Sequence, residues 1–241
     1  MALLEAACPV GEDDREWIDN TLRWLRENIG PEGLTTTVIL PTDEFFPGPY
    51  GGTRREQRTL VRRIAGWLRV DPARVVAGSA NRYDDRRVFQ STPPGVEQLH
   101  GHYRTASGRV FIDLDGLPDA PVQVVTAIAH ELAHDRLPPV AGPPSLDDEE
   151  TIDLVLVYLG LGVFAANAAL EYEKHLQGTR VSFRVSRGGV LTEQMYGYAL
   201  ARYARMRHES SPAWAAYLDL NPRTYLRRAM RYLDRVDGVS P

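Results

Sequence analysis

Apolar and polar positions follow two different periods along the first half of the chain. Apolar side chains recur every three or four positions in segments 13–28 and 53–68, and this spacing predicts two amphipathic helices. Three shorter runs are bounded by turn residues and rich in β-branched side chains, which is typical of strands. These predicted strands are segments 34–40, 74–77 and 109–114. The first half therefore predicts a small sheet accompanied by helices.

The second half of the chain shows helical spacing almost throughout. The predicted helices are segments 121–135, 148–175, 192–208, 212–219 and 222–235. No internal repeat and no clear linker interrupts this order. We therefore expect a single α+β domain over residues 1–241, with a small N-terminal sheet and a mainly helical C-terminal half.

Segment 154–170 is apolar almost without interruption, which raises the question of a membrane span. Its 17 residues fall short of the roughly 20 that cross a bilayer, and they include Asn167 and two glycines. A helix that is apolar on every side is typical of the middle of a sizeable domain. The segment therefore predicts a buried core helix rather than a membrane anchor.

Net charge limits the kinds of binding partner, and the cysteine content and the N-terminal residues indicate the cellular compartment. The 241 residues carry 28 basic and 32 acidic side chains, a formal net charge of −4, so no overall positive field attracts nucleic acid. Cys8 is the single cysteine, which excludes an intramolecular disulfide, and the first residues lack the pattern of a secretory signal. We expect a cytoplasmic protein without a nucleic-acid or membrane partner, and the sequence leaves the oligomeric state open.

The candidate chemistry lies in residues 130–134, which read His-Glu-Leu-Ala-His. On a helix, His130 and His134 are one turn apart on the same face, where both can bind one metal ion. Glu131 lies beside them and can take up or release a proton. Apolar residues dominate segment 122–133, so we expect a rigid, buried helix. This combination is typical of a zinc hydrolase, with Zn2+ (zinc) as the cofactor.

The segments on either side of this motif add to the hypothesis. Strand 109–114 precedes the helix, and an exposed edge on this strand would bind an extended peptide by backbone pairing. After the motif, a proline-rich loop leads to an acidic run that can supply a third ligand. This run consists of Asp147, Asp148, Glu149, Glu150 and Asp153.

Other histidines and tyrosines are less specific candidates for a second metal site or for stabilising negative charge during the reaction. His100 and His102 would point the same way on a strand and offer a second metal site, but a polar strand edge is the simpler interpretation. A side chain that steadies a developing negative charge must be a neutral or cationic donor. The candidates for this task are Tyr158, His175, Tyr196, Tyr198 and His208.

The motif His-Glu-Leu-Ala-His, followed by an acidic residue and an aspartate four positions later, resembles the thermolysin-type zinc peptidases called gluzincins. The resemblance covers about residues 130–160 and implies a zincin-like arrangement around the active-site helix. It implies zinc ligands His130, His134 and Glu149, the general base Glu131, and Asp153 as support for a ligand histidine. The chain also resembles uncharacterised bacterial proteins that carry the same motif.

The third ligand has one competitor. Glu150 is the alternative to Glu149, because the distance along the chain from motif to acidic run is shorter than in thermolysin. Glu149 is favoured because it shares a helical face with Asp153.

We therefore expect a zinc metallopeptidase-like hydrolase that cleaves amide (peptide) bonds in a peptide or protein substrate by metal-activated water. Two alternatives stay open. One is a zinc enzyme that acts on a small molecule in a specialised biosynthetic pathway, and the other is a non-catalytic regulatory or interaction module. Glu131 argues against the second alternative, because a structural metal site has no use for a base at that position.

Overall fold

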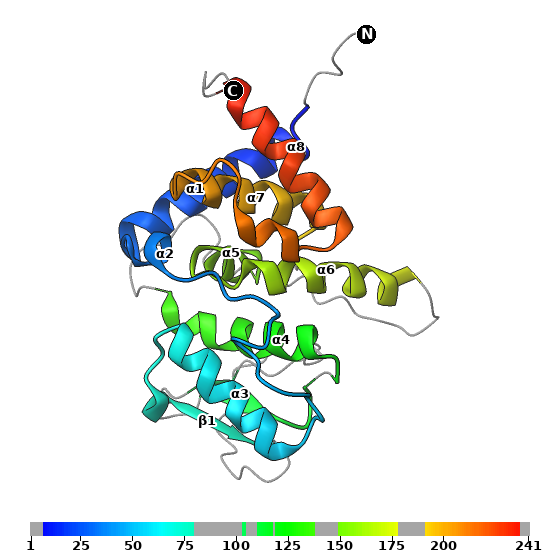
Figure 1. Cartoon of the computed structure of the whole chain (residues 1–241). Helices are drawn as coiled ribbons and strands as arrows, with labels where there is room; N and C mark the ends of the chain where they lie inside the picture. Colours follow the sequence, from blue (N-terminus) through cyan, green and yellow to red (C-terminus); the bar gives the residue numbers. More distant parts are fainter. Residues whose placement is uncertain are drawn as a thin grey trace, which may run out of the picture. The chain divides into compact units, whose positions relative to one another are not determined.

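The structure, a computed structural model, consists of helices and one small sheet and confirms the α+β class (Figure 1). It describes residues 7–79, 103–104, 110–117, 119–137, 149–177 and 191–236. The chain divides into two compact units. The helical unit comprises Met1–Pro41, Pro138–Thr179 and Gly189–Pro241, and the sheet unit comprises Thr42–Leu137 and Arg180–Gly188. One domain over residues 1–241 stays a prediction.

In its described residues, the sheet unit has three short strands and two long helices. Its elements are α3 (Arg54–Trp67), η1 (Pro72–Arg74), β1 (Val75–Gly78), β2 (Tyr103–Arg104), β3 (Val110–Asp113), α4 (Pro121–Ala133) and η4 (His134–Arg136). The strand order is β1-β3-β2, with β1 parallel and β2 antiparallel to β3. The predicted helices 53–68 and 121–135 and the predicted strands 74–77 and 109–114 are confirmed to within two residues at each end.

The central position of β3 corrects one expectation. Val110 and Phe111 pair with β1 on one side and with β2 on the other, so this part of the strand has no exposed edge. The prediction that segment 109–114 offers a free edge to a peptide is therefore wrong for these residues. The sequence did not predict the pairing partner on this side, because the pairing of β2 with β3 depends on tertiary contacts rather than on a local pattern.

The core of the sheet unit lies among α3, α4 and β3. Helix α3 begins with a capping box, in which Thr53 and Glu56 bond each other's backbone N–H groups. Its apolar face packs against α4. Ahead of α3, Phe45 and Phe46 stack edge-to-face on Trp67, with ring centres 5.9 and 5.3 Å away. These contacts fix the frame from which α4 projects.

The part of the helical unit that the structure describes contains seven helical segments. They are α1 (Glu12–Asn28), α2 (Glu32–Thr35), α5 (Glu149–Tyr158), α6 (Gly162–Gln177), α7 (Glu193–Met206), η5 (Ala213–Tyr217) and α8 (Leu220–Val236). Helix α7 packs against α1, α5, α6 and α8, so it is the centre of this unit. The predicted helices 13–28, 192–208 and 222–235 are confirmed, and segment 212–219 contains the short 3-10 helix η5.

The long apolar segment is buried, as predicted, but it forms two helices rather than one. Every residue from 151 to 166 is buried. The chain turns at Gly160, whose φ of 86° favours glycine, and a Cβ there would lie 2.8 Å from the carbonyl oxygen of Thr37. The backbone around Thr37 passes close to Gly160, and the glycine leaves room for it at the turn between α5 and α6. Among the described residues, none of the helices has the length and apolarity that a bilayer crossing requires.

The prediction of a strand at 34–40 is wrong. Glu32–Thr35 forms the short helix α2, and residues 36–40 have no sheet partner. The backbone groups of this segment bond elsewhere: Arg207 Nη1 donates to the carbonyl oxygens of Leu34 and Thr36, at 2.9 and 2.8 Å. The Ile39 N–H donates to the carbonyl oxygen of Gly160 at 2.9 Å. Because tertiary partners satisfy these groups, β-branched residues remain outside a sheet.

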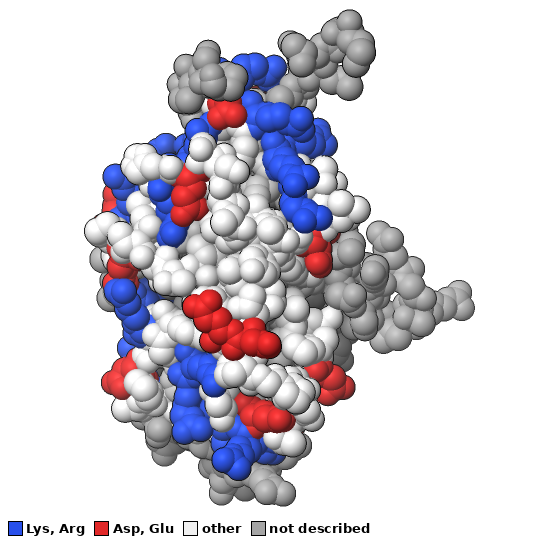
Figure 2. All heavy atoms as spheres, viewed as in Figure 1, with Lys and Arg blue, Asp and Glu red and all other residues white. Residues whose placement is uncertain are grey.

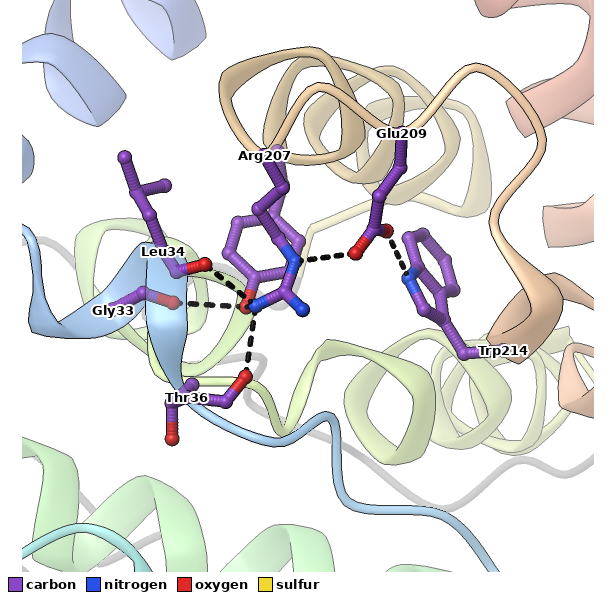
Figure 3. A network of polar contacts seen from close by, with 7 residues as sticks. Gly33, Leu34, Thr36, Arg207, Glu209 and Trp214 are labelled. Carbon is purple, nitrogen blue, oxygen red and sulfur yellow. Dashed lines mark hydrogen bonds and ion pairs between the residues drawn. The ribbon is translucent and has the colours of Figure 1, made fainter.

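Arg207 belongs to a polar network at the end of α7 (Figure 3). Its Nε donates to Glu209 Oε1 at 2.8 Å, and Trp214 Nε1 donates to the other Glu209 oxygen at 2.7 Å. Tyr203 donates its hydroxyl to the Gly33 carbonyl at 3.0 Å, and burial raises the pKa of this phenol to about 12. The network attaches the residues at and just after α2 to the C-terminal end of helix α7.

Arginines follow the outer face of α8. Arg227, Arg228, Arg231 and Arg235 are exposed, and basic side chains lie along this helix in the upper right of Figure 2. The opposite face, with Leu226 among its buried residues, packs against α7. This division of polar and apolar faces is typical of a surface helix.

Gly197 allows α7 and α8 to approach closely, and this contact gives a first prediction. A Cβ at Gly197 would lie 2.4 Å from Tyr225 Cβ and 2.9 Å from the Leu226 nitrogen, neither of which can move without a shift of α8. We expect Gly197→Ala to lower the free energy of unfolding by about 1–3 kcal/mol. Thermal unfolding measured by circular dichroism checks this.

The matched control for this substitution is Gly66→Ala in α3. A Cβ at Gly66 meets no atom within 4 Å, so the same change there should raise stability by up to about 1 kcal/mol. Equal melting temperatures for Gly197→Ala and the wild type would contradict the close packing of the two helices.

Candidate metal centre

Helix α4 positions the motif found in the sequence. The helix begins with Pro121 at its first position, where the missing N–H costs nothing, and buries Val124, Val125 and Ile128 in the sheet unit. His130 and His134 follow with half-buried side chains, one turn apart at the C-terminal end of the helix. Because helical residues at i and i+4 share a face, both imidazoles lie on the same side of α4.

The geometry of the two imidazoles suits a shared metal ion. Their ring centres are 5.4 Å apart and the ring planes meet at 74°. Two imidazoles that each bind a tetrahedral zinc ion through one nitrogen, at about 2.0–2.1 Å, have ring centres about 5 Å apart. The pair therefore requires little movement to bind one ion.

Glu131 is the most buried polar residue of the motif, with 8% of its surface exposed. Its helix neighbours Ile128 and Leu132 are fully buried. A motif that arose by chance on a surface helix would leave this carboxylate in water. A buried carboxylate between two histidines in the sequence is instead suited to exchange a proton with a bound molecule.

The chain changes conformation directly after the motif. Helix α4 ends at Ala133, and residues His134–Arg136 form the 3-10 helix η4. Asp135 Oδ1 lies 2.6 Å from Arg74 Nη2, and the Asp135 side chain is 5% exposed. The sequence did not predict this ion pair, because Arg74 and Asp135 are far apart in the chain and a charge pair of this kind leaves no local pattern.

The acidic candidates lie on α5. Glu149 and Glu150 form its first turn and are half-buried, and Asp153 is 2% exposed. Asp153 Oδ2 accepts a hydrogen bond from the Leu191 N–H at 3.0 Å. Burial, together with the charge of Asp153 and a hydrogen bond to it, raises the pKa of the Tyr196 phenol well above its ordinary value. These contacts attach α5 to α7 and to the residues just before it.

The sequence candidates are thus divided between the two units. The sheet unit brings His130 and His134 together and also contains Glu131, which follows His130 in the chain. Glu149, Glu150 and Asp153 belong to the helical unit, where Glu149 and Asp153 are one turn apart on α5. Participation of Glu149 and support from Asp153 stay predictions. His100, His102, Asp147 and Asp148 lie outside the described residues.

Three of the five candidates for stabilising negative charge hold structural contacts in the helical unit. Tyr158 donates its hydroxyl to the Gly30 carbonyl at 2.7 Å, and Tyr198 donates to the Asp19 carboxylate at 3.1 Å. Tyr196 bonds Asp153, as described above. His208 is exposed, and the side chain of His175 lies outside the described part of the chain.

Comparisons with known proteins add no relative: no family model, no curated protein and no solved structure matches the chain. The functional interpretation therefore depends on the chemistry of the residues on α4 and α5.

Proposed function

We propose that this protein is a zinc-dependent hydrolase that cleaves amide (peptide) bonds. The observation that carries the proposal is the pairing of His130 and His134 on α4 with the buried carboxylate of Glu131 beside them. In this proposal the two histidines and Glu149 bind the ion, Glu131 is the general base, and the arrangement around α4 is zincin-like.

The donor set suits zinc. In this proposal, His130, His134 and Glu149 each offer one ligand atom to the same metal ion. Zinc accepts imidazole nitrogens together with a carboxylate oxygen, and two histidines plus one glutamate is a known catalytic combination. Three protein ligands leave a fourth position for water or substrate, whereas structural zinc sites are closed by four protein ligands. The set is therefore that of a reactive site.

When bound, zinc polarises a carbonyl group and lowers the pKa of water toward neutrality. Glu131 accepts the proton of the attacking water and then delivers it to the leaving amine. Its burial keeps the carboxylate out of bulk solvent, so its proton passes to the reacting molecule. A general base of this kind contributes about 10²- to 10⁴-fold to the rate.

Asp153 maintains the helix that carries the proposed third ligand. Its carboxylate accepts the Leu191 N–H and bonds the Tyr196 hydroxyl, so the first turns of α5 are attached to α7 and the residues just before it. A fixed helix holds the Glu149 backbone in one place, which lowers the entropy lost when its carboxylate binds an ion. We assign this anchoring to Asp153 in addition to the support of a ligand histidine.

Zinc content tests both the proposal and the choice of third ligand. We expect about one zinc ion per purified wild-type chain, measured by plasma mass spectrometry, and loss of peptide hydrolysis after treatment with a chelator. Glu149→Gln should weaken zinc binding, because it replaces an anionic ligand with a neutral amide. Glu150→Gln, one position along α5, is the matched control and should keep its zinc.

The zinc content of the two variants also shows which glutamate is the third ligand. Retention of zinc by Glu149→Gln and its loss from Glu150→Gln would assign the third ligand to Glu150. A wild-type protein without zinc affinity in chelator competition would overturn the proposed function. Zinc binding without hydrolysis of any peptide would favour the small-molecule or non-catalytic alternatives.

A further inference from the structure

Arg74 is held in place by local structure before its side chain makes any contact. Asp71 caps η1 by accepting the Ala73 N–H at 2.9 Å, and the Arg74 N–H donates to the Asp71 carbonyl at 2.9 Å. The next residue, Val75, begins β1 and is aligned with Val110 of β3. The backbone of Arg74 is therefore part of the rigid frame of the sheet unit.

The Asp135 carboxylate is buried, so its negative charge needs a positive partner. Its side chain is 5% exposed, and its Oδ1 lies 2.6 Å from Arg74 Nη2. Removing a charge from water costs free energy unless an opposite charge or hydrogen bonds compensate it. The guanidinium of Arg74 supplies that charge from a residue far away in the sequence.

The ion pair lies at the point where the metal motif ends. His134 is both the C-cap of α4 and the first residue of η4, and Asp135 is its direct neighbour in that short turn. The last turn of a helix frays readily, because its carbonyl groups lack partners within the helix. Attachment of Asp135 to Arg74 fixes the turn and with it the backbone of His134.

We propose that Arg74 and Asp135 are positioning residues of the metal centre, which hold His134 one turn above His130 in a geometry ready for the ion. The inference rests on the proposed function, since it concerns the same metal site. Neither side chain binds the metal in this proposal. Partners outside the ligand set typically contribute about 10- to 100-fold to metal affinity by fixing ligand orientation.

Zinc affinity of Arg74→Gln, measured by competition with a chromophoric chelator, tests the inference. We expect the dissociation constant for zinc to rise about 10- to 100-fold. The visible absorption of the cobalt-substituted protein should change as well, because it reports ligand geometry and would be unaffected by a loss of stability alone. Arg74→Lys keeps the charge and should restore most of the affinity.

The sheet unit offers a matched control in Arg54, which forms an ion pair with Asp115. The Arg54 side chain is 45% exposed and that of Arg74 is 47% exposed, so both substitutions remove a comparably exposed arginine, from Asp115 at 37% exposure and from Asp135 at 5%. Arg54→Gln should leave the dissociation constant for zinc and the cobalt spectrum unchanged. A loss of stability common to both variants is thereby separated from an effect on the metal centre.

A second variant covers the case in which Arg74→Gln does not fold. Asp135→Asn removes the buried charge and leaves Arg74 accessible to solvent, so this variant should fold and still show the 10- to 100-fold loss of zinc affinity. Wild-type affinity in folded Arg74→Gln or Asp135→Asn would overturn the inference and leave the proposed function intact. A wild-type protein that binds no zinc would overturn both.

Discussion

Glu131→Gln is expected to lower the rate of peptide hydrolysis by about 10²- to 10⁴-fold while zinc stays bound. Glutamine has the shape of glutamate but cannot accept the proton of an attacking water, so the chemical step loses its base. The side chain is 8% exposed, and an amide of the same size occupies the same space. Cleavage of a defined peptide mixture, followed by mass spectrometry, gives the rate.

Two measurements make this result specific. The zinc content and melting temperature of Glu131→Gln should equal those of the wild type, which excludes a loss of fold or metal. Glu27→Gln makes the same chemical change at an exposed position of α1 and should hydrolyse at the wild-type rate. Undiminished hydrolysis by Glu131→Gln would end the hydrolase hypothesis.

His130→Ala is expected to abolish stable zinc binding, because it removes one of two imidazoles that act from the same helix face. The increase in the dissociation constant should exceed the 10- to 100-fold typical of losing a partner outside the ligand set. A ligand that binds only the folded state at 1,000 times its dissociation constant stabilises that state by about 4 kcal/mol. The wild type should therefore melt at a higher temperature with zinc, and His130→Ala should not.

Thr126→Ala is the control for this variant. Thr126 lies one turn before His130 on α4, is half-buried, and donates its hydroxyl to the Val122 carbonyl at 2.9 Å. Its replacement shows how far an alanine substitution in α4 by itself changes the melting temperature and zinc binding. A zinc-dependent rise in melting temperature that persists in His130→Ala would exclude His130 as a ligand.

Local spacing was sufficient to predict most helices. Segments 13–28, 53–68 and 121–135 carry apolar residues at helical intervals, and the structure has α1, α3 and α4 there. The errors arose where partners distant in sequence decide the conformation. Residues 34–40 satisfy their backbone through Arg207 and Gly160 instead of a neighbouring strand.

The candidate metal centre shows the same division. The placement of His130 and His134 on one face follows from the helical repeat, and the structure confirms it with ring centres 5.4 Å apart. The ion pair of Arg74 with Asp135 was not foreseen, because it joins the start of β1 to the end of α4. Charge pairs between distant segments leave no periodic pattern in a sequence.

The sequence by itself determined the α+β class, the buried character of segment 154–170 and the presence of two imidazoles and a carboxylate on one helix. Each follows from the local pattern of apolar and polar residues, which can be recognised within single helices and strands. Only the tertiary structure decided that Gly160 divides the apolar segment, that β3 is enclosed by two strands, and that Asp135 meets Arg74. These features depend on which distant segments pack together, because a turn, a strand edge or a buried charge is stabilised by its neighbours in space.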